Sequence, residues 1–334
     1  MSATSKLPPP VRVGSWSEKW PPKPTWTADN VPDLTGKVVL CTGGSAGIGK
    51  ETCRVLVSRN AKVYLASRSE DKAQAAIDDI CKTTSKMNMI HFLHVDLGDL
   101  VSVRKAAEEF ISKEKELHVL INNGGVLYAP GIGPVTSQGY DVQFGANALG
   151  HYFLTILLMP TLLRTAKGEV SGTPCQVRIV AVSSDAHEAT APKQGIVWES
   201  LQKGDAALRM RKKLTGTRLY GQSKLGMVLI SNELARRYGD QGVISISLHP
   251  GGVKSELLRN VHPIIAWIVD KIRLYPVSLG IITSLYAATS EEAEKMNGEY
   301  LTCWARRQVP SKHAQNREMA EKLWVWCEEQ VSTF

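Results

Sequence analysis

The sequence predicts a doubly wound α/β domain, in which one parallel sheet of about seven strands carries helices on both faces. Two observations predict this class. Short apolar runs rich in β-branched residues alternate with longer stretches of helical spacing, and a glycine-rich turn follows the first apolar run. Strands that are apolar along nearly their whole length are typical of a parallel sheet, because helices cover both of its faces.

The expected elements alternate along the chain. The apolar runs expected to form strands are residues 37–41, 61–66, 90–95, 117–121, 177–183, 243–248 and 299–303. The stretches with helical spacing are residues 47–59, 70–83, 99–115, 141–165, 220–238 and 318–330. The domains expected are a Pro/Trp-rich arm at 1–33, laid on the body by its indole rings, and a single domain at 34–334 with substrate-lid segments near 185–219 and 253–285.

Composition is that of a globular protein, with 43% hydrophobic and 22% charged residues. No apolar run approaches the roughly 20 residues of a membrane span, and the N-terminus lacks the apolar core of a signal peptide. We therefore expect a cytoplasmic protein without a transmembrane segment. The six cysteines form neither CxxC pairs nor a cluster with histidine, which favours reduced, mostly buried thiols over disulfides, and we expect no metal site.

The net charge of +8 raises the question of a nucleic-acid partner. The densest basic stretch, LRMRKKLTGTR at 208–218, has no interleaved aromatic residues and no nucleic-acid-reading motif, so nucleic acid is not expected. A solvated surface is the favoured interpretation. Peripheral contact with a membrane or another anion stays open, as does the choice between monomer and homodimer.

The stretch TGGSAGIGK at 42–50 has four glycines directly after the first apolar run. Glycine accepts φ > 0 and lets another backbone or a ligand approach closely. Between a strand and a helix, such a turn presents unpaired N–H groups at the positive end of the helix dipole, which suits a phosphate or pyrophosphate. An ordinary tight turn is the alternative, so the interpretation depends on the rest of the chain.

Four motifs in order along the chain carry a resemblance to a known family. TGGSAGIG at 42–49 resembles the TGxxxGxG turn of the short-chain dehydrogenase/reductase family, and NNGG at 122–125, VSS at 182–184 and YGQSK at 220–224 match its further motifs. The similarity covers about residues 34–255 and points to retinol-dehydrogenase-like and fungal secondary-metabolite members. It implies a Rossmann-type fold, a nicotinamide dinucleotide cofactor and an oxidoreductase.

Tyr220 and Lys224 are spaced i, i+4, which places both on one face of a helix. Tyrosine is a poor acid–base group at neutral pH, but a nearby ammonium stabilises the phenolate and is expected to lower its pKa. A solvated tyrosine and lysine are the alternative. The resemblance implies that Tyr220 exchanges a proton with the substrate and that Lys224 also binds the nicotinamide ribose.

The resemblance implies two further catalytic residues. Ser184 is expected to bind the substrate oxygen and steady developing charge, with Ser183 the less favoured choice. Asn147 is expected to hold a water in the proton relay, with a helix cap or kink as the alternative role. The long insertion between Ser184 and Tyr220 is expected to cover the site, and His187 within it is expected to be structural or a substrate wall rather than a general base.

The second strand ends in Ser67 and Arg68, where an NAD site normally has an acidic residue. Arginine can meet a 2′-phosphate with a planar fork of donors, so NADP(H) is expected in preference to NAD. Gly125 departs from the alanine usual in the family's NNAG, which should be tolerated beside the cofactor. The cofactor contacts expected from these arguments and from the resemblance are Gly43, Ser45, Gly47, Ile48, Gly49, Arg68, Lys72, Asp96, Leu97, Asn123, Gly124, Tyr220, Lys224, Pro250, Gly251, Val253 and Ser255.

The function expected is an NADP(H)-dependent carbonyl reductase or alcohol dehydrogenase acting on a lipophilic small molecule. A non-catalytic NADP(H)-sensing protein and an epimerase or dehydratase of the same family are the alternatives. The lipophilic substrate is inferred from the apolar segment around Leu257, Ile264 and Trp267, which is interpreted as a mobile lid, with core packing or a dimer contact nearly as well supported.

Overall fold

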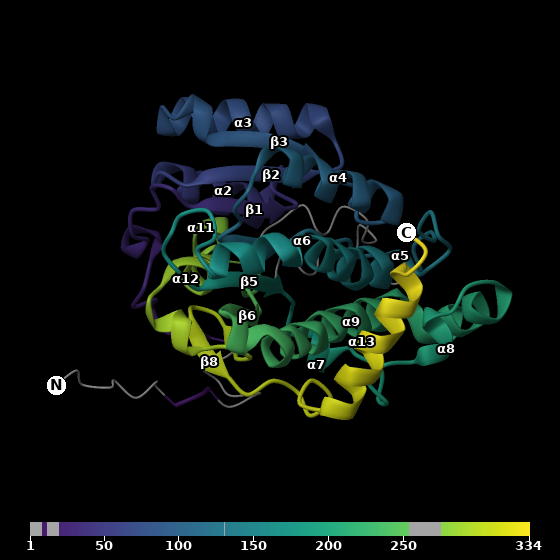
Figure 1. Ribbon diagram of the computed structural model, residues 1–334. Coiled ribbons are helices and arrows are strands. Elements are labelled where there is room, and N and C mark those ends of the chain that lie inside the picture. The colour runs from purple at the N-terminus through teal and green to yellow at the C-terminus, as the bar shows by residue number, and fades with distance from the viewer. Residues whose placement is uncertain (1–8, 12–19, 130, 254–274) are drawn as a thin grey trace.

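The computed structural model describes residues 9–11, 20–129, 131–253 and 275–334. Its centre is an eight-stranded sheet in the order β3-β2-β1-β4-β5-β6-β7-β8 (Figure 1). All neighbouring strands pair in parallel except β7 and β8, which are antiparallel. The strands are β1 (Val38–Thr42), β2 (Lys62–Ser67), β3 (Ile90–His94), β4 (Val119–Asn122), β5 (Val177–Val182), β6 (Val243–Leu248), β7 (Tyr300–Thr302) and β8 (Arg306–Gln308).

The doubly wound α/β fold predicted from the sequence is confirmed, with one difference at the edge of the sheet. The short strand β8 has the sequence Arg-Arg-Gln and pairs back onto β7. Its side chains carry no apolar pattern, because an edge strand of three residues can be held by backbone hydrogen bonds alone. The expected count of about seven strands therefore becomes eight.

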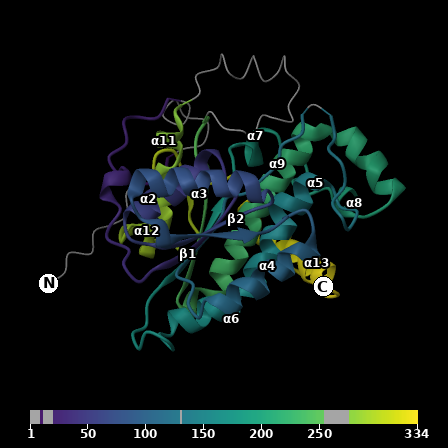
Figure 2. The ribbon, with the colours of Figure 1, turned by 90° about the horizontal axis from the view of Figure 1, so that it is seen from above.

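Helices cover both faces of the sheet, and each face has its own apolar core (Figure 2). One core joins the sheet to α4, α6, α9 and α13, and the other joins it to α2, α3 and α12. The helices in chain order are α2 (Gly47–Ser58), α3 (Glu70–Thr84), α4 (Leu100–Lys113), α5 (Val142–Phe144), α6 (Gly150–Ala166), α7 (Ala186–Ala189), α8 (Trp198–Leu201), α9 (Asp205–Tyr238), α11 (Val277–Gly280), α12 (Ile282–Thr289) and α13 (Arg317–Val331).

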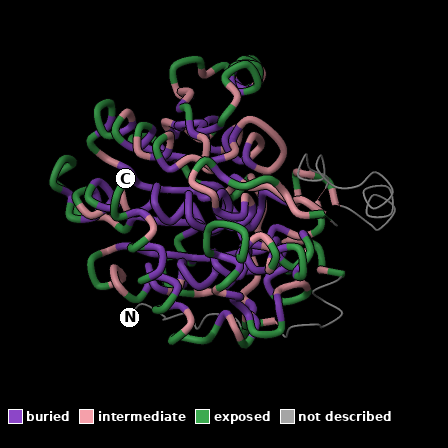
Figure 3. The backbone as a smooth tube through the Cα atoms, turned by 90° about the vertical axis from the view of Figure 1, so that its right-hand side faces the viewer, coloured by how far each residue is buried: buried purple, intermediate pink, exposed green. Residues whose placement is uncertain are grey.

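The strands alternate between the two cores because successive side chains point to opposite faces. Leu40 of β1 lies in the core beneath α4 and α6, whereas its neighbours Val39 and Cys41 lie in the core beneath α2 and α3. All five β1 side chains are buried, which explains why the sequence of this strand is almost entirely apolar. Buried backbone accordingly fills the middle of the molecule (Figure 3).

The helix expected at 141–165 is interrupted by a π-helical turn, Gly145–Leu149, between α5 and α6. By length and apolarity the segment Val142–Ala166 could cross a membrane, with a mean hydropathy of 1.3 over its most apolar stretch, which the sequence analysis did not anticipate. However, 78% of that stretch is buried inside the protein. Its apolarity is therefore that of a core helix.

Helix α9 begins fifteen residues earlier than the expected 220–238, at Asp205, and bends at Thr215, whose φ of 68° is not helical. The first part of α9 includes the basic stretch 208–218. It projects to one side of the molecule together with α8 (Figure 1). Much of the insertion thus lies in α7, α8 and the first part of α9.

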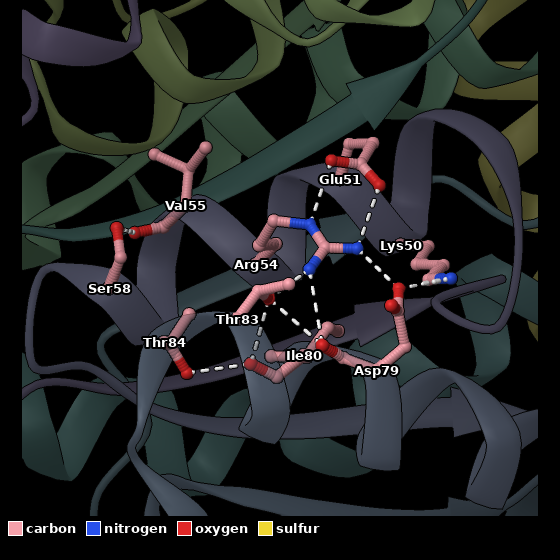
Figure 4. A network of polar contacts seen from close by, with 9 residues as sticks. All are labelled: Lys50, Glu51, Arg54, Val55, Ser58, Asp79, Ile80, Thr83 and Thr84. Atoms are coloured by element: carbon pink, nitrogen blue, oxygen red, sulfur yellow. Dashed lines mark hydrogen bonds and ion pairs between the residues drawn. The ribbon is translucent and has the colours of Figure 1, made fainter.

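A network of charged groups ties α2 to α3 (Figure 4). The Arg54 guanidinium binds both oxygens of Glu51 at 2.9 and 3.2 Å and reaches Asp79 of α3 at 2.6 Å. Lys50 binds the same Asp79 carboxylate at 2.7 Å. These contacts lower the pKa of the Asp79 carboxyl to about 2, with the hydrogen bond from Lys50 as the largest cause and that from Arg54 as the next. They fix the spacing between the two helices whose first turns follow β1 and β2.

The described part of the N-terminal arm contacts the body at several places. The backbone of Val11 donates a hydrogen bond to Arg307 at 2.7 Å, beside β8. Trp26 packs edge-to-face on Tyr286 of α12, with ring centroids 5.5 Å apart. Trp20 is 48% exposed, and Trp16 lies outside the described residues.

Candidate functional site

A cavity of about 530 Å³ lies at the carboxyl ends of β1 to β6. In an open parallel sheet ligands bind at this edge, next to the point where the strand order reverses. Here the reversal falls between β1 and β4. Every described residue expected to contact the cofactor lines this one cavity, namely Gly43, Ser45, Gly47, Ile48, Gly49, Arg68, Lys72, Asp96, Leu97, Asn123, Gly124, Tyr220, Lys224, Pro250, Gly251 and Val253.

The glycine turn after β1 is shaped by two steric requirements. Gly43 has φ of +67°, and a β-carbon on it would lie 2.7 Å from the backbone of Gly124. A β-carbon on Gly49 would lie 2.3 Å from the carbonyl oxygen of Gly43. Neither position can therefore hold a larger residue without moving the backbone.

Helix α2 starts at this turn without a side-chain cap. Its N-cap residue is Ala46, whose methyl side chain cannot accept a hydrogen bond from the first turn. The N–H groups at the start of a helix lack intrahelical partners and carry the positive end of the helix dipole. The turn thus meets the requirements of a dinucleotide pyrophosphate: free donors, positive potential and room for close approach.

Thr42, the last residue of β1, joins the glycine turn to the turn after β4. Its hydroxyl oxygen accepts hydrogen bonds from the backbone of Asn123 at 3.0 Å and of Gly124 at 2.9 Å. The Asn123 side-chain amide donates in return to the Thr42 carbonyl at 2.9 Å. The two turns therefore form one rigid wall of the cavity.

The turns after β2 and β3 bring opposite charges to the far end of the cavity. An Arg68 guanidinium nitrogen lies 4.0 Å from an Asp96 carboxylate oxygen, and the two side chains are 68% and 37% exposed. Lys72 lines the same end, in the first turn of α3. Here the cavity offers a guanidinium and an ammonium where an NAD site would offer an acid.

Both serines after β5 line the cavity, but their hydroxyl groups are held differently. Ser183 is buried, and its hydroxyl donates to the Lys224 carbonyl at 2.8 Å. The Ser184 side chain is partly exposed to the cavity, and its hydroxyl donates to Asp185 at 2.9 Å. Of the two hydroxyls, that of Ser184 is the one positioned to meet a ligand.

Tyr220 and Lys224 lie one turn apart on the buried face of α9, 7% and 4% exposed. The Lys224 ammonium donates to the Val182 carbonyl at 2.8 Å and lies 5.8 Å from the centre of the Tyr220 ring. Both side chains line the cavity beside Ser184.

Burial sets the protonation of this pair. It lowers the pKa of Lys224 to about 8, so that the ammonium form still dominates at neutral pH. Burial, reinforced by the negative charge of Asp185, raises the pKa of Tyr220 well above its usual range, against a hydrogen bond from Ser184 that lowers it. Desolvation of the phenolate thus shifts the Tyr220 pKa upward, the opposite direction to the one expected from Lys224. A tyrosine in this state is a proton donor.

Asn147 is completely buried in the π-helical turn. Its amide oxygen accepts from the Val126 backbone at 2.8 Å, and its amide nitrogen donates to the Val126 carbonyl and to Ser223, both at 3.0 Å. It does not line the cavity directly. It holds the turn after β4 against α9, next to the segment that carries Tyr220 and Lys224.

His151 is a residue of this region that sequence reasoning missed. It is buried one helical turn after Asn147 and bridges the Asn147 carbonyl and the Thr42 hydroxyl, each at 2.8 Å. Burial lowers its pKa to about 4. The only available signal was its i, i+4 spacing from Asn147, which has no meaning until Thr42 is known to lie opposite.

His187 occupies the structural role that the sequence analysis favoured. It is 2% exposed, and its Nδ1 lies 2.7 Å from the Ser184 carbonyl. Its Nε2 accepts from the Ser311 backbone at 3.3 Å. Its hydrogen bonds therefore stabilise the turn that contains Ser184, and the imidazole does not line the cavity.

Other expected site residues cannot be placed. Ser255 and the lid residues Leu257, Ile264 and Trp267 lie outside the described residues. The lid interpretation therefore stays a prediction. The six cysteines are all free thiols, four of them buried, as the sequence predicted.

The comparisons with known proteins agree on one family. The short chain dehydrogenase profile matches residues 37–195. A short-chain dehydrogenase/reductase of Armillaria gallica is 47% identical over 319 residues, which cover 95% of this chain and 97% of the relative. Retinol dehydrogenase 12 of Mus musculus is 37% identical over 297 residues, which cover 88% of this chain and 86% of the relative.

A solved structure shares the fold at lower identity. The 3-ketoacyl-(acyl-carrier-protein) reductase of Brucella melitensis, complexed with NADH, superimposes with a TM-score of 0.60. It is 20% identical and the match covers 80% of this chain and 97% of that one.

Proposed function

Because the chain belongs to the short-chain dehydrogenase/reductase family, as its four motifs predicted, we propose that it is an NADP(H)-dependent oxidoreductase that interconverts a carbonyl and an alcohol on a lipophilic small molecule. The observation that carries the proposal is the single cavity. One end combines an uncapped helix with Arg68, and the other combines Ser184, Tyr220 and Lys224.

The reaction end can supply and stabilise a proton. When bound, a reduced nicotinamide supplies the hydride that reaches the carbonyl carbon. The Ser184 hydroxyl has one proton, which turns from Asp185 to the carbonyl oxygen as negative charge develops on that oxygen. Tyr220, which its surroundings keep protonated, donates its proton to that oxygen and completes the alcohol. Lys224 provides the positive charge that stabilises the resulting phenolate.

The choice of NADP(H) rests on the far end of the cavity. Arg68 follows β2 where an acid would bind the ribose of NAD, and Lys72 is nearby. A guanidinium binds a phosphate with two parallel hydrogen bonds, whereas a carboxylate would repel it. Asp96 is close enough to hold Arg68 in place without occupying its fork, because their separation is 4.0 Å.

We also propose a lipophilic substrate and a cytoplasmic location. Retinol dehydrogenase 12 of Mus musculus, whose name states an apolar alcohol, is 37% identical. The apolar walls Val126, Leu127 and Val253 line the reaction end of the cavity. A substrate that is mostly hydrocarbon would gain from contact with these side chains.

Turnover of the purified chain tests the proposal directly. NADPH and NADH would each be supplied at matched concentrations with a panel of ketones and aldehydes of graded size, and with alcohols plus the oxidised cofactors in the reverse direction. We expect absorbance of the nicotinamide to change with bulky apolar carbonyls and NADPH. Binding of NADPH without turnover of any compound would favour the sensing protein, and change of substrate without net change in nicotinamide would favour an epimerase or dehydratase.

A further inference from the structure

A carboxylate stands immediately beside the serine that meets the substrate oxygen. Asp185 follows Ser184 in sequence, lines the same cavity, and has a side chain that is 60% exposed. Its Oδ1 accepts the Ser184 hydroxyl at 2.9 Å. A carboxylate can accept about four hydrogen bonds, so it retains capacity for a further donor.

A histidine faces this carboxylate from the next strand. Strands β5 and β6 pair with Val182 opposite Leu248, so the residues that follow them emerge at the same edge. His249 is 8% exposed and lines the cavity, with its Nδ1 3.9 Å from Asp185 Oδ1.

The His249 Nδ1 atom is buried and has no hydrogen-bond partner among the described residues. A buried polar atom without a partner is costly, and such atoms usually have a reason to be kept. The gap of 3.9 Å to the carboxylate is too long for a direct hydrogen bond. Asp185 Oδ1 and His249 Nδ1 thus lie 3.9 Å apart as an acceptor and an unpartnered ring nitrogen, the first exposed and the second just beneath the cavity surface.

We propose that Asp185 and His249 form a polar subsite that binds a hydroxyl group of the substrate, close to the carbonyl that reacts. A hydroxyl is both donor and acceptor: its O–H donates to the exposed Asp185 carboxylate, and its oxygen accepts from the His249 Nδ1–H once the imidazole turns to bring that buried nitrogen to the cavity surface. Successive α-carbons are 3.8 Å apart, so a group bound by Asp185 lies within a few bonds of an oxygen bound by Ser184. The preferred substrate is therefore a hydroxyketone on an otherwise apolar skeleton.

The subsite favours a hydroxyketone over a simple ketone, because a ketone without the hydroxyl leaves Asp185 and His249 without a hydrogen-bond partner from the substrate. An apolar ketone would cover Asp185 and His249 without replacing the water that solvates them. Sites built to hydrogen-bond a hydroxyl reject analogues that lack it, often by large factors. Partial desolvation raises the Asp185 pKa, but the facing His249 and the hydrogen bond from Ser184 outweigh it and hold that pKa below its usual value, so the carboxylate is ionised.

The test, which rests on the proposed function, compares matched substrates. The full-length chain with saturating NADPH would be given a ketone, its α-hydroxy derivative, the corresponding methyl ether and the corresponding amine. The wild type is expected to show a kcat/KM for the hydroxyketone that is about ten-fold or more above those for the ketone and the ether. In Asp185→Asn that ratio should fall about ten-fold, and His249→Phe should lower it as well.

A matched control and a folding check make the result decisive. Glu199→Gln removes an exposed carboxylate of α8 that does not line the cavity, and it should leave the ratio as in the wild type. Taking the ratio cancels any change that Asp185→Asn causes in Tyr220, since that change affects all four substrates. NADPH binding, measured by fluorescence, confirms that each variant is folded. If the Asp185→Asn variant does not fold, the His249→Phe variant alone provides the test.

The outcomes separate the subsite from the function. Equal kcat/KM for ketone and hydroxyketone, an unchanged ratio in both variants, or a preference for the amine would overturn the subsite while leaving the reductase intact. Absence of turnover with every carbonyl compound would overturn the proposed function and, with it, the subsite.

Discussion

The two ends of the cavity hold their charged groups in different surroundings. At the reaction end, Tyr220 and Lys224 are 7% and 4% exposed, and burial shifts the pKa of both. At the far end, Arg68 and Asp96 are 68% and 37% exposed and lie 4.0 Å apart. Exposed charges are screened by water, whereas buried ones interact strongly. A charged side chain therefore changes the energy of its neighbours more at the reaction end than at the far end.

The difference suits two tasks. Proton transfer needs a fixed environment, which the buried end provides through hydrogen bonds that pass from Thr42 through His151 to Asn147. Selection between two cofactors needs only a modest difference in binding, which an exposed guanidinium can supply. Substitutions at the two ends should accordingly differ in size.

The largest effect is expected for Tyr220→Phe. Phenylalanine preserves the ring that packs in the buried end and removes only the hydroxyl, so the fold and NADPH affinity should be retained. Loss of a general acid typically costs about 100-fold to 10,000-fold in rate, and kcat should fall by about that much. Steady-state kinetics, with circular dichroism and NADPH binding as controls, measure this. Wild-type rates in the variant would show that another group transfers the proton.

The second effect concerns stability and the buried His151. Its pKa is lowered from 6.5 to about 4, so the unfolded chain binds more protons between these values. The free energy of unfolding should therefore be highest above about pH 6.5 and fall as the pH approaches 4. Over the whole window from pH 6.5 to pH 4 this single group contributes roughly 3 kcal/mol, of which about 2 kcal/mol is lost by pH 5.

Urea unfolding at pH 7 and pH 5 measures the loss, and His151→Gln, which can keep both hydrogen bonds, is the comparison. The variant should show a shallower fall with pH. His118, whose pKa burial also lowers to about 4, remains in both proteins and cancels. Identical pH dependence in the two proteins would mean that His151 is not buried in its neutral form.

Local motifs were predictable from the sequence because their geometry is set within a few residues. The glycine turn and the i, i+4 pair Tyr220–Lys224 are of this kind. The approach of His249 to Asp185 was not predictable, since it depends on the register of β5 against β6. The π-helical turn around Asn147 was missed for a related reason: a helix with one extra residue per turn has no distinct apolar period.

A smaller effect is expected for Arg68→Ala at the exposed end. A charge-assisted hydrogen bond is worth about 1.5–3 kcal/mol at most, and exposure reduces that value. The KM for NADPH should rise about ten-fold while the KM for NADH changes little. Lys72→Ala, which removes a second cation of the same end, is the matched comparison and should have a weaker effect. Equal losses with both cofactors would point to local distortion instead.

The smallest effect is expected for Gly125→Ala, which introduces the residue usual in the family at the boundary of the two ends. A β-carbon there would lie 3.2 Å from the Asn147 amide oxygen and 3.6 Å from the Lys224 ammonium. The first contact is tight, so Asn147 must shift by a few tenths of an ångström, whereas the second is ordinary packing. Because Asn147 is held by three hydrogen bonds, that shift should slightly weaken the wall between β4 and α9. We expect kcat to fall about two-fold to three-fold with the KM for NADPH unchanged, and a loss of ten-fold or more would show that the open space at Gly125 is itself needed for the reaction.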